Sequence, residues 1–157
     1  MTSGYAPGDG HPLGAYAVLT GGFVAALGGA LAAARATGRE IDRPGLADVL
    51  LHGLATRKLS RLIARDKVTS FLRAPFARFQ DTAGHGELEE APRGGGLRFA
   101  VGELLVCPYC LAQWVAGGLA VGHVLAPRTT RMLSAMSAAQ AIADGIQLAY
   151  SAGEQQT

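Results

Sequence analysis

The sequence predicts an all-α protein: a small multi-pass helical membrane bundle with two to three transmembrane helices and one amphipathic interfacial helix. Two long segments without a charged residue, 12–34 and 104–127, are the main reason for this prediction. Each exceeds the roughly 20 apolar residues that a helix needs to cross a bilayer. Composition agrees, because 29 Ala and 22 Gly among 157 residues suit helices that pack closely.

Composition also excludes several classes of protein. Charged residues make up 17% of the chain, below the roughly 25% of soluble domains, and hydrophobic residues make up 49%. Disorder requires the opposite balance. Two cysteines are too few for a disulfide scaffold, and a net charge of +2 does not indicate nucleic-acid binding.

The first half of the chain is expected to contain a tail and two helices. Residues 1–11 are rich in Gly and Pro and predict a flexible tail. Segment 12–34 predicts the first span; a buried Ala-rich core helix is the alternative. Segment 44–65 has one apolar side and one side with four cations, each costing about 2.5–3.5 kcal/mol at the bilayer centre. It therefore predicts an amphipathic helix at the membrane surface.

The second half predicts a loop and two more helices. Turn-forming residues at 81–97 predict a mobile loop, and 104–127 predicts the second span. Segment 129–151 predicts a third span with a polar stripe that includes Asp144; an amphipathic helix outside the bilayer is the alternative. The expected single helical domain is thus 12–151, followed by a short tail at 152–157.

The distribution of basic residues predicts an orientation. Segment 35–98 holds 12 of the 14 Lys and Arg residues, and none precedes Arg35. The positive-inside rule then places 36–98 in the cytoplasm and the N-terminus outside a bacterial inner membrane.

Cys107 and Cys110 form the sharpest chemical motif, a CxxC at the expected start of the second span. Two thiols at this spacing can share one metal ion, zinc or iron, with His52 as a speculative further ligand. They can also form a reversible disulfide, because a helix N-terminus lowers a thiol pKa. Plain packing is the third interpretation. On the cytoplasmic rim a permanent disulfide is not expected.

Other polar residues have both structural and functional interpretations. Glu103 suits a helix start, Trp114 suits the membrane interface, and Asp144 is an intramembrane carboxylate or half of a salt bridge. A dense polar run between 61 and 73 has two interpretations. It can bind anionic lipid head groups or a partner, or it can form an internal network. Its members are Arg61, Arg65, Asp66, Lys67, Thr69 and Arg73.

Two strings together resemble a known family: RDKVTSFLRAPF at 65–76 and GELLVCPYCLAQW at 102–114. They are similar to a bacterial membrane-protein family of unknown function, domain of unknown function 1360, over about 46–150. The resemblance implies importance for nine positions but supplies no activity: Arg61, Asp66, Lys67, Thr69, Arg73, Glu103, Cys107, Cys110 and Trp114.

The expected function is that of an integral membrane protein with a structural or accessory role in a membrane complex. Its expected partners are membrane lipids and either a second copy or another membrane protein. No complete catalytic constellation is present, which argues against an enzyme. The alternatives are a membrane thiol oxidoreductase that uses Cys107 and Cys110, and a soluble Ala-rich helical interaction protein.

Overall fold

The computed structural model describes residues 12–39, 43–84 and 86–154, and these are mostly helical. The expected tail at 1–11 lies outside the described residues. Of the expected tail at 152–157, the first three residues continue the last helix. The described ranges contain six α-helices, one 3-10 helix and two strands: α1 (Leu13–Ala36), α2 (Leu46–Arg65), η1 (Lys67–Thr69), α3 (Ser70–Arg73), β1 (Ala77–Ala83), β2 (Glu87–Pro92), α4 (Gly96–Val106), α5 (Pro108–Leu125) and α6 (Pro127–Glu154).

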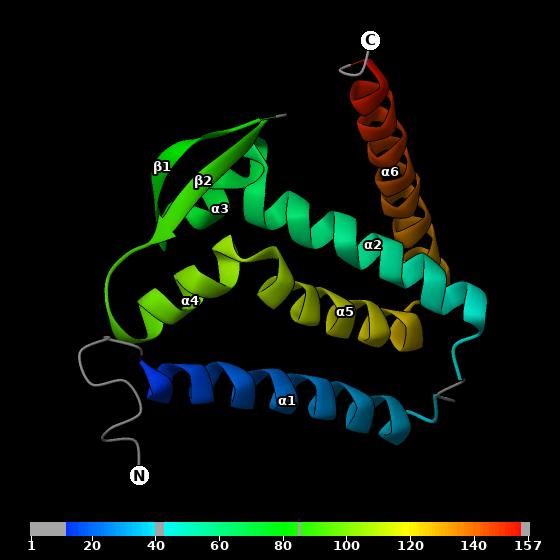
Figure 1. Cartoon of the computed structure of the whole chain (residues 1–157). Coiled ribbons are helices and arrows are strands. Elements are labelled where there is room, and N and C mark those ends of the chain that lie inside the picture. The colour runs from blue at the N-terminus through cyan, green and yellow to red at the C-terminus, as the bar shows by residue number, and fades with distance from the viewer. Residues whose placement is uncertain (1–11, 40–42, 85, 155–157) are drawn as a thin grey trace.

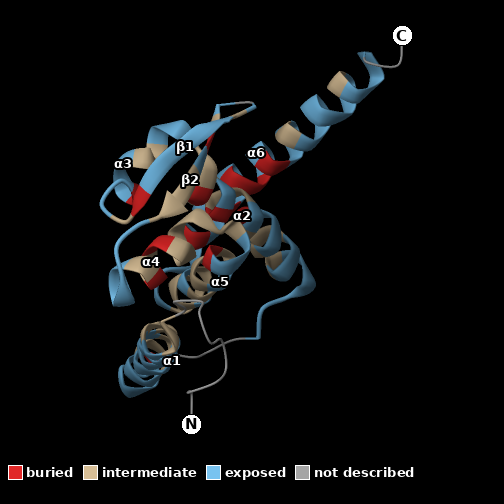
Figure 2. Cartoon of the chain, turned by 60° about the vertical axis from the view of Figure 1, so that its left-hand side comes forward, coloured by how far each residue is buried: buried red, intermediate tan, exposed pale blue. Residues whose placement is uncertain are grey.

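Three long helices stack in layers, with α5 between α1 and α2 (Figure 1). The Phe23 ring of α1 meets the Trp114 ring of α5 edge-on, with centroids 5.2 Å apart. Gly117 leaves the room that this ring occupies, since a Cβ there would lie 2.7 Å from Phe23. Along α1, the face away from the body is exposed over almost the whole helix (Figure 2).

The helices α1 and α5 run in the same direction, whereas the expected orientation requires two successive spans to run antiparallel. Tyr16 near the start of α1 reaches Glu103 of α4, and Arg39 beyond its end donates to the Leu125 carbonyl at 2.6 Å. Two successive spans joined by a cytoplasmic loop must run antiparallel. The parallel packing therefore does not fit an N-terminus outside with all of 36–98 inside.

The expected second span is not one helix. It breaks at Cys107, where α4 and α5 meet at 86°. The residue before a proline is disfavoured in the helical conformation, and Cys107 is extended, with φ −104° and ψ 105°. Pro108, which has no N–H to leave unpaired, then begins α5. Instead of lying inside a span, the CxxC motif starts at a sharp corner.

The expected loop at 81–97 is largely an antiparallel hairpin, which also adds a small sheet to the predicted all-α fold. Strands β1 and β2 pair from Ala77 with Pro92 to Ala83 with Glu87. The hairpin packs closely on α4: a Cβ at Gly102 would lie 3.0 Å from the Cβ of Pro92 in β2 and 2.5 Å from the carbonyl oxygen of Phe76, which precedes β1. Local turn residues suggested a loop, whereas tertiary contacts hold this segment as strands.

The core between α2 and α6 consists of small residues, seen as the buried patch in Figure 2. Within the described ranges, α1 alone has the length and apolarity of a single membrane-crossing helix. Helices α4 and α5 reach these criteria only together, as a bent pair. The predicted third span forms a helix, α6, that does not meet them. The buried residues of this core are Ala55, Ser60, Ala64, Ser134, Ser137, Ala138 and Ala141.

Candidate functional site: a thiol corner, a buried arginine and a histidine pair

Cys107 caps the N-terminus of α5. Its Sγ accepts a hydrogen bond from the Cys110 backbone N–H at 3.3 Å, and its carbonyl oxygen accepts from the Leu111 N–H at 3.0 Å. Both cysteines are free thiols; Cys107 is half-buried and Cys110 is exposed. The corner thus presents one thiol to solvent and holds the other against the first turn of the helix.

The surroundings of Cys107 favour its thiolate. Burial by itself disfavours the charged form, but hydrogen bonds from the Cys110 side chain and from the backbone of Cys110 and Tyr109 outweigh it. The nearby charge of Arg65 acts in the same direction. Together they lower the pKa of Cys107 below that of an ordinary thiol. This is the property that a nucleophilic cysteine requires.

A largely apolar pocket of about 420 Å³ lies beside Cys110, between α1 and the α4–α5 corner. Phe23 and Trp114 form part of its wall, and Tyr16 donates a hydrogen bond to Glu103 there. Glu103 therefore holds α4 to α1 and does not cap a helix start. Trp114 serves as a contact between helices.

Arg73 belongs to an internal network, one of the two interpretations of the basic run. Its side chain is fully buried and forms an ion pair with Glu90 of β2. It also donates to the carbonyl oxygens of Ile63 and Asp66, at 2.6 and 2.9 Å, and to Thr69 Oγ1 at 2.8 Å. One guanidinium therefore connects α2, η1 and the hairpin.

The other members of the run have different positions. Asp66 accepts a hydrogen bond from the Val68 N–H at 3.0 Å and so starts η1. Thr69 donates to the Leu62 carbonyl at 2.6 Å, which folds η1 back on the end of α2. Lys67 is exposed, whereas Arg65 is half-buried near Cys107.

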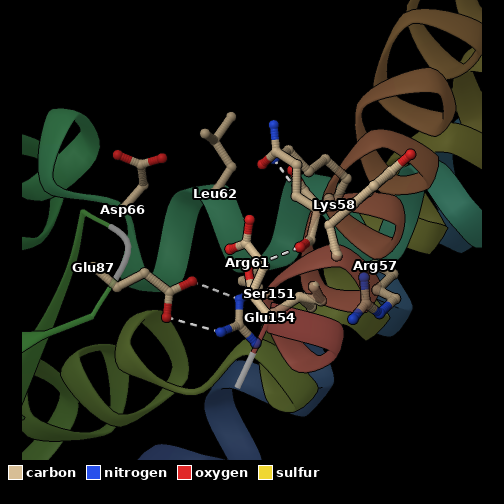
Figure 3. A pocket seen from close by; sticks show the side chains of 12 residues that line it. Arg57, Lys58, Arg61, Leu62, Asp66, Glu87, Ser151 and Glu154 are labelled. Atoms are coloured by element: carbon tan, nitrogen blue, oxygen red, sulfur yellow. Dashed lines mark hydrogen bonds and ion pairs between the residues drawn. The ribbon is translucent and has the colours of Figure 1, made fainter. Parts of the chain in front are cut away.

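A second pocket, of about 580 Å³, is lined by the C-terminal halves of α2 and α6 and by Glu87 of the hairpin (Figure 3). Arg61 reaches Glu87 across it with two hydrogen bonds, of 2.5 and 2.8 Å. Asp144 of α6 pairs with Lys58 of α2 at 2.8 Å. Asp144 thus forms a salt bridge between helices, as one of its two interpretations held.

His52 lies at the opposite end of α5 from the thiols. Its Nε2 is 3.1 Å from His123 Nδ1, and its Nδ1 is 2.9 Å from Ser134 Oγ. The 16 residues from Cys107 to His123 span about 24 Å of helix, so His52 does not complete a metal site with the cysteines. Within the described part of the chain, the three-ligand group that could hold a metal is Asp48, His52 and His123.

Sequence reasoning missed this group because His52 and His123 are 71 residues apart and the expected orientation put them on different sides of the membrane. Finding it would have required knowing how the start of α2 packs against the end of α5. That packing is a tertiary contact, which a single sequence does not show.

Comparison with known proteins gives a family. Residues 51–150 match the family described as "Protein of unknown function (DUF1360)". The chain belongs to this family. It is 32% identical over 108 residues to UPF0713 protein YngL of Bacillus subtilis (strain 168), covering 65% of this chain and 79% of that protein. It is 35% identical over 92 residues to Sporulation protein YjcA of the same organism, covering 57% and 77%. No solved structure matches.

Proposed function

We propose that this DUF1360 member is an integral membrane protein with a structural or accessory role in a membrane complex. The observation that carries the proposal is α1: no residue from 13 to 34 is charged, and almost none of the helix is buried by the rest of the chain. Exposing so much apolar surface to water is unfavourable, and apolar patches of this extent are rare on soluble monomers. Lipid is the environment that suits it.

The parallel packing of α1 and α5 implies that the chain returns between them, and α2 is the segment that does so. Its 20 residues extend about 30 Å, the thickness of the hydrocarbon core. Two ion pairs with α6 each neutralise one charge on α2, Asp48 with Arg131 and Lys58 with Asp144, and Arg61 near the hairpin end pairs with Glu87. Pairing between helices is how charged side chains are tolerated inside membranes. We therefore propose that α1, α2 and α5 cross together, with α6 packed against α2 (Figure 1).

This arrangement gives a revised orientation. The hairpin, the α4–α5 corner and the start of α1 share one end of the bundle (Figure 1). Nine of the 14 basic residues lie between 57 and 98, in the C-terminal half of α2 and at this end. The positive-inside rule then favours a cytoplasmic location for the hairpin, the thiols and the N-terminus.

Membrane attachment is tested by carbonate washing of membranes that contain the full chain or one of two variants. Val24 of α1 and Val68 of η1 are both well exposed, at 61% and 73%. In lipid, Val24→Lys costs about 2.5–3.5 kcal/mol. It should therefore lower the fraction of chains that insert and raise the carbonate-soluble fraction, whereas Val68→Lys should not. Release of the wild-type chain by carbonate, or equal behaviour of the two variants, contradicts the proposal and favours a soluble interaction protein.

A second candidate function is thiol–disulfide exchange at the cytoplasmic rim, favoured by the lowered pKa of Cys107 at a helix N-terminus. The Cys107 thiolate would attack a disulfide of a partner, breaking its S–S bond and releasing one thiolate. Cys110, after losing its proton, would attack the Cys107 sulfur and release the second thiolate. Two electrons would pass to the partner and leave a Cys107–Cys110 disulfide.

Glutathione disulfide is the probe for this chemistry. With Cys110→Ser, Cys107 should form a stable mixed disulfide with glutathione; with Cys107→Ser, Cys110 should react far more slowly. The wild-type chain should instead accumulate the internal disulfide. Equal rates for the two single variants, or no internal disulfide in the wild type, would exclude exchange. The two remaining interpretations of the thiols would then be half of a four-ligand zinc or iron set shared between two copies, and plain packing.

A further inference from the structure

We propose that Asp48, His52 and His123 bind one divalent transition-metal ion, with zinc as the best match, where the first turns of α2 and α6 meet the end of α5. One carboxylate and two imidazoles offer ligand atoms that all lie within 4.8 Å of one another. Two histidines and one carboxylate, with a fourth position open to water, form a ligand set that zinc accepts in proteins.

The distance between the histidines fits a shared ion. His52 Nε2 and His123 Nδ1 are 3.1 Å apart. Two nitrogens bound to one tetrahedral zinc at 2.0–2.1 Å are about 3.3–3.4 Å apart. The rings therefore need to separate by only a few tenths of an ångström, and their T-shaped packing already directs one nitrogen of each toward the other.

Ser134 is placed to hold the ring of His52 in the orientation that metal binding requires. Ser134 Oγ is 2.9 Å from His52 Nδ1, and Ser134 is fully buried. With a metal on Nε2, the proton of His52 lies on Nδ1 and is donated to this hydroxyl. Such a partner fixes the tautomer and the ring orientation of a metal-binding histidine.

Arg131 is the group that acts against a cation, since it makes two hydrogen bonds to Asp48, at 2.8 and 2.9 Å. A carboxylate has about four lone-pair sites, so one oxygen of Asp48 can accept from Arg131 and still bind a metal. The positive charge of Arg131 nevertheless weakens binding. Arg131→Gln, which keeps a donor and removes the charge, should therefore tighten metal binding.

The test uses the tag-free full chain in detergent, treated with a chelator and then titrated with Co²⁺, whose absorption spectrum reports tetrahedral coordination. The wild type should bind one Co²⁺ per chain, and Zn²⁺ should displace it. His52→Gln, His123→Asn and Asp48→Asn should each weaken binding by more than about 100-fold, because the loss of a residue that only orients a metal ligand already costs about 10–100-fold. Ser134→Ala should weaken metal binding by about 10–100-fold, because Ser134 orients His52 and does not itself bind the metal.

The double variant Cys107→Ser/Cys110→Ser is the matched control, because it removes both thiols at the far end of α5. It should bind Co²⁺ as the wild type does. Far-UV circular dichroism without metal checks that each histidine variant still folds, and Arg131→Gln provides a variant whose affinity should rise. The proposal fails if the wild type binds no metal, if binding survives in His52→Gln/His123→Asn, or if binding is lost with the cysteines.

Discussion

Replacing Arg73 should destabilise this fold more than any exposed substitution. The side chain is completely buried, and four of its interactions are with Glu90, Ile63, Asp66 and Thr69. Arg73→Met leaves the buried Glu90 carboxylate and two carbonyl oxygens without their donor. Deleting one partner of a buried ion pair costs about 3–5 kcal/mol. Since whole domains are stable by about 5–15 kcal/mol, this is a large share of the total.

The assay is unfolding in mixed micelles with increasing denaturing detergent, followed by far-UV circular dichroism. Arg73→Lys keeps the charge, but an ammonium cannot reach all of these acceptors, so the loss should be intermediate. Arg73→Met/Glu90→Leu removes both charges and should recover at least about 1 kcal/mol relative to the sum of the single losses. A loss below about 1 kcal/mol for Arg73→Met, or strict additivity in the double variant, would refute the assigned network.

Three further predictions concern single positions. Gly102→Ala should cost about 1–3 kcal/mol in the same unfolding assay, because its Cβ would lie 2.5 Å from the Phe76 carbonyl oxygen. Thr69→Val should cost about 1–3 kcal/mol, because the hydroxyl that links the end of α2 to the buried guanidinium is lost. The lowered pKa of Cys107 means that its thiolate persists to lower pH than usual, so alkylation followed by tandem mass spectrometry should reach half its maximal rate at a lower pH than for a free cysteine measured alongside. Arg65→Gln should move that midpoint upward.

Matched controls separate these effects from general damage. Gly118→Ala adds a Cβ with nothing within 4 Å and should be neutral or stabilising. Thr69→Ser keeps the hydroxyl and should lose much less than Thr69→Val. Unfolding losses for Gly118→Ala that equal those of Gly102→Ala would contradict the close approach of α4 to the hairpin, and a Cys107 midpoint at or above that of a free thiol would contradict the assigned capping contacts.

Helix content was predictable from the sequence because it depends on local pattern. The uncharged segment 12–34 and the two-sided segment 44–65 correspond to α1 and α2 within a few residues. The break at Cys107 was partly predictable from the sequence, because proline is typical of the first position of a helix and Pro108 is the first residue of α5. The 86° turn there depends on how α4 packs against the hairpin and α1, which the sequence does not reveal.

The hairpin and the histidine pair could not be predicted because long-range contacts create them. Residues 87–90 lie in the segment that was expected to be a mobile loop, yet Glu90 is buried against Arg73, 17 positions earlier. The parallel course of α1 and α5 was missed for a related reason. Charge counting assumes that successive apolar segments alternate in direction. Here α2 lies between the two apolar segments and returns the chain to the end at which α1 began (Figure 1).

The most direct measurement of the proposed membrane arrangement is side-specific labelling of two single cysteines in a chain with Cys107→Ser and Cys110→Ser. Thr37→Cys lies just beyond α1 and Gly84→Cys lies between the strands, at opposite ends of α2. Both positions are exposed, and Gly84 has open space for a side chain. The arrangement predicts that an impermeant maleimide added to intact cells labels Thr37→Cys and spares Gly84→Cys. Labelling of both or neither would place the two ends of α2 on one side of the membrane and contradict it.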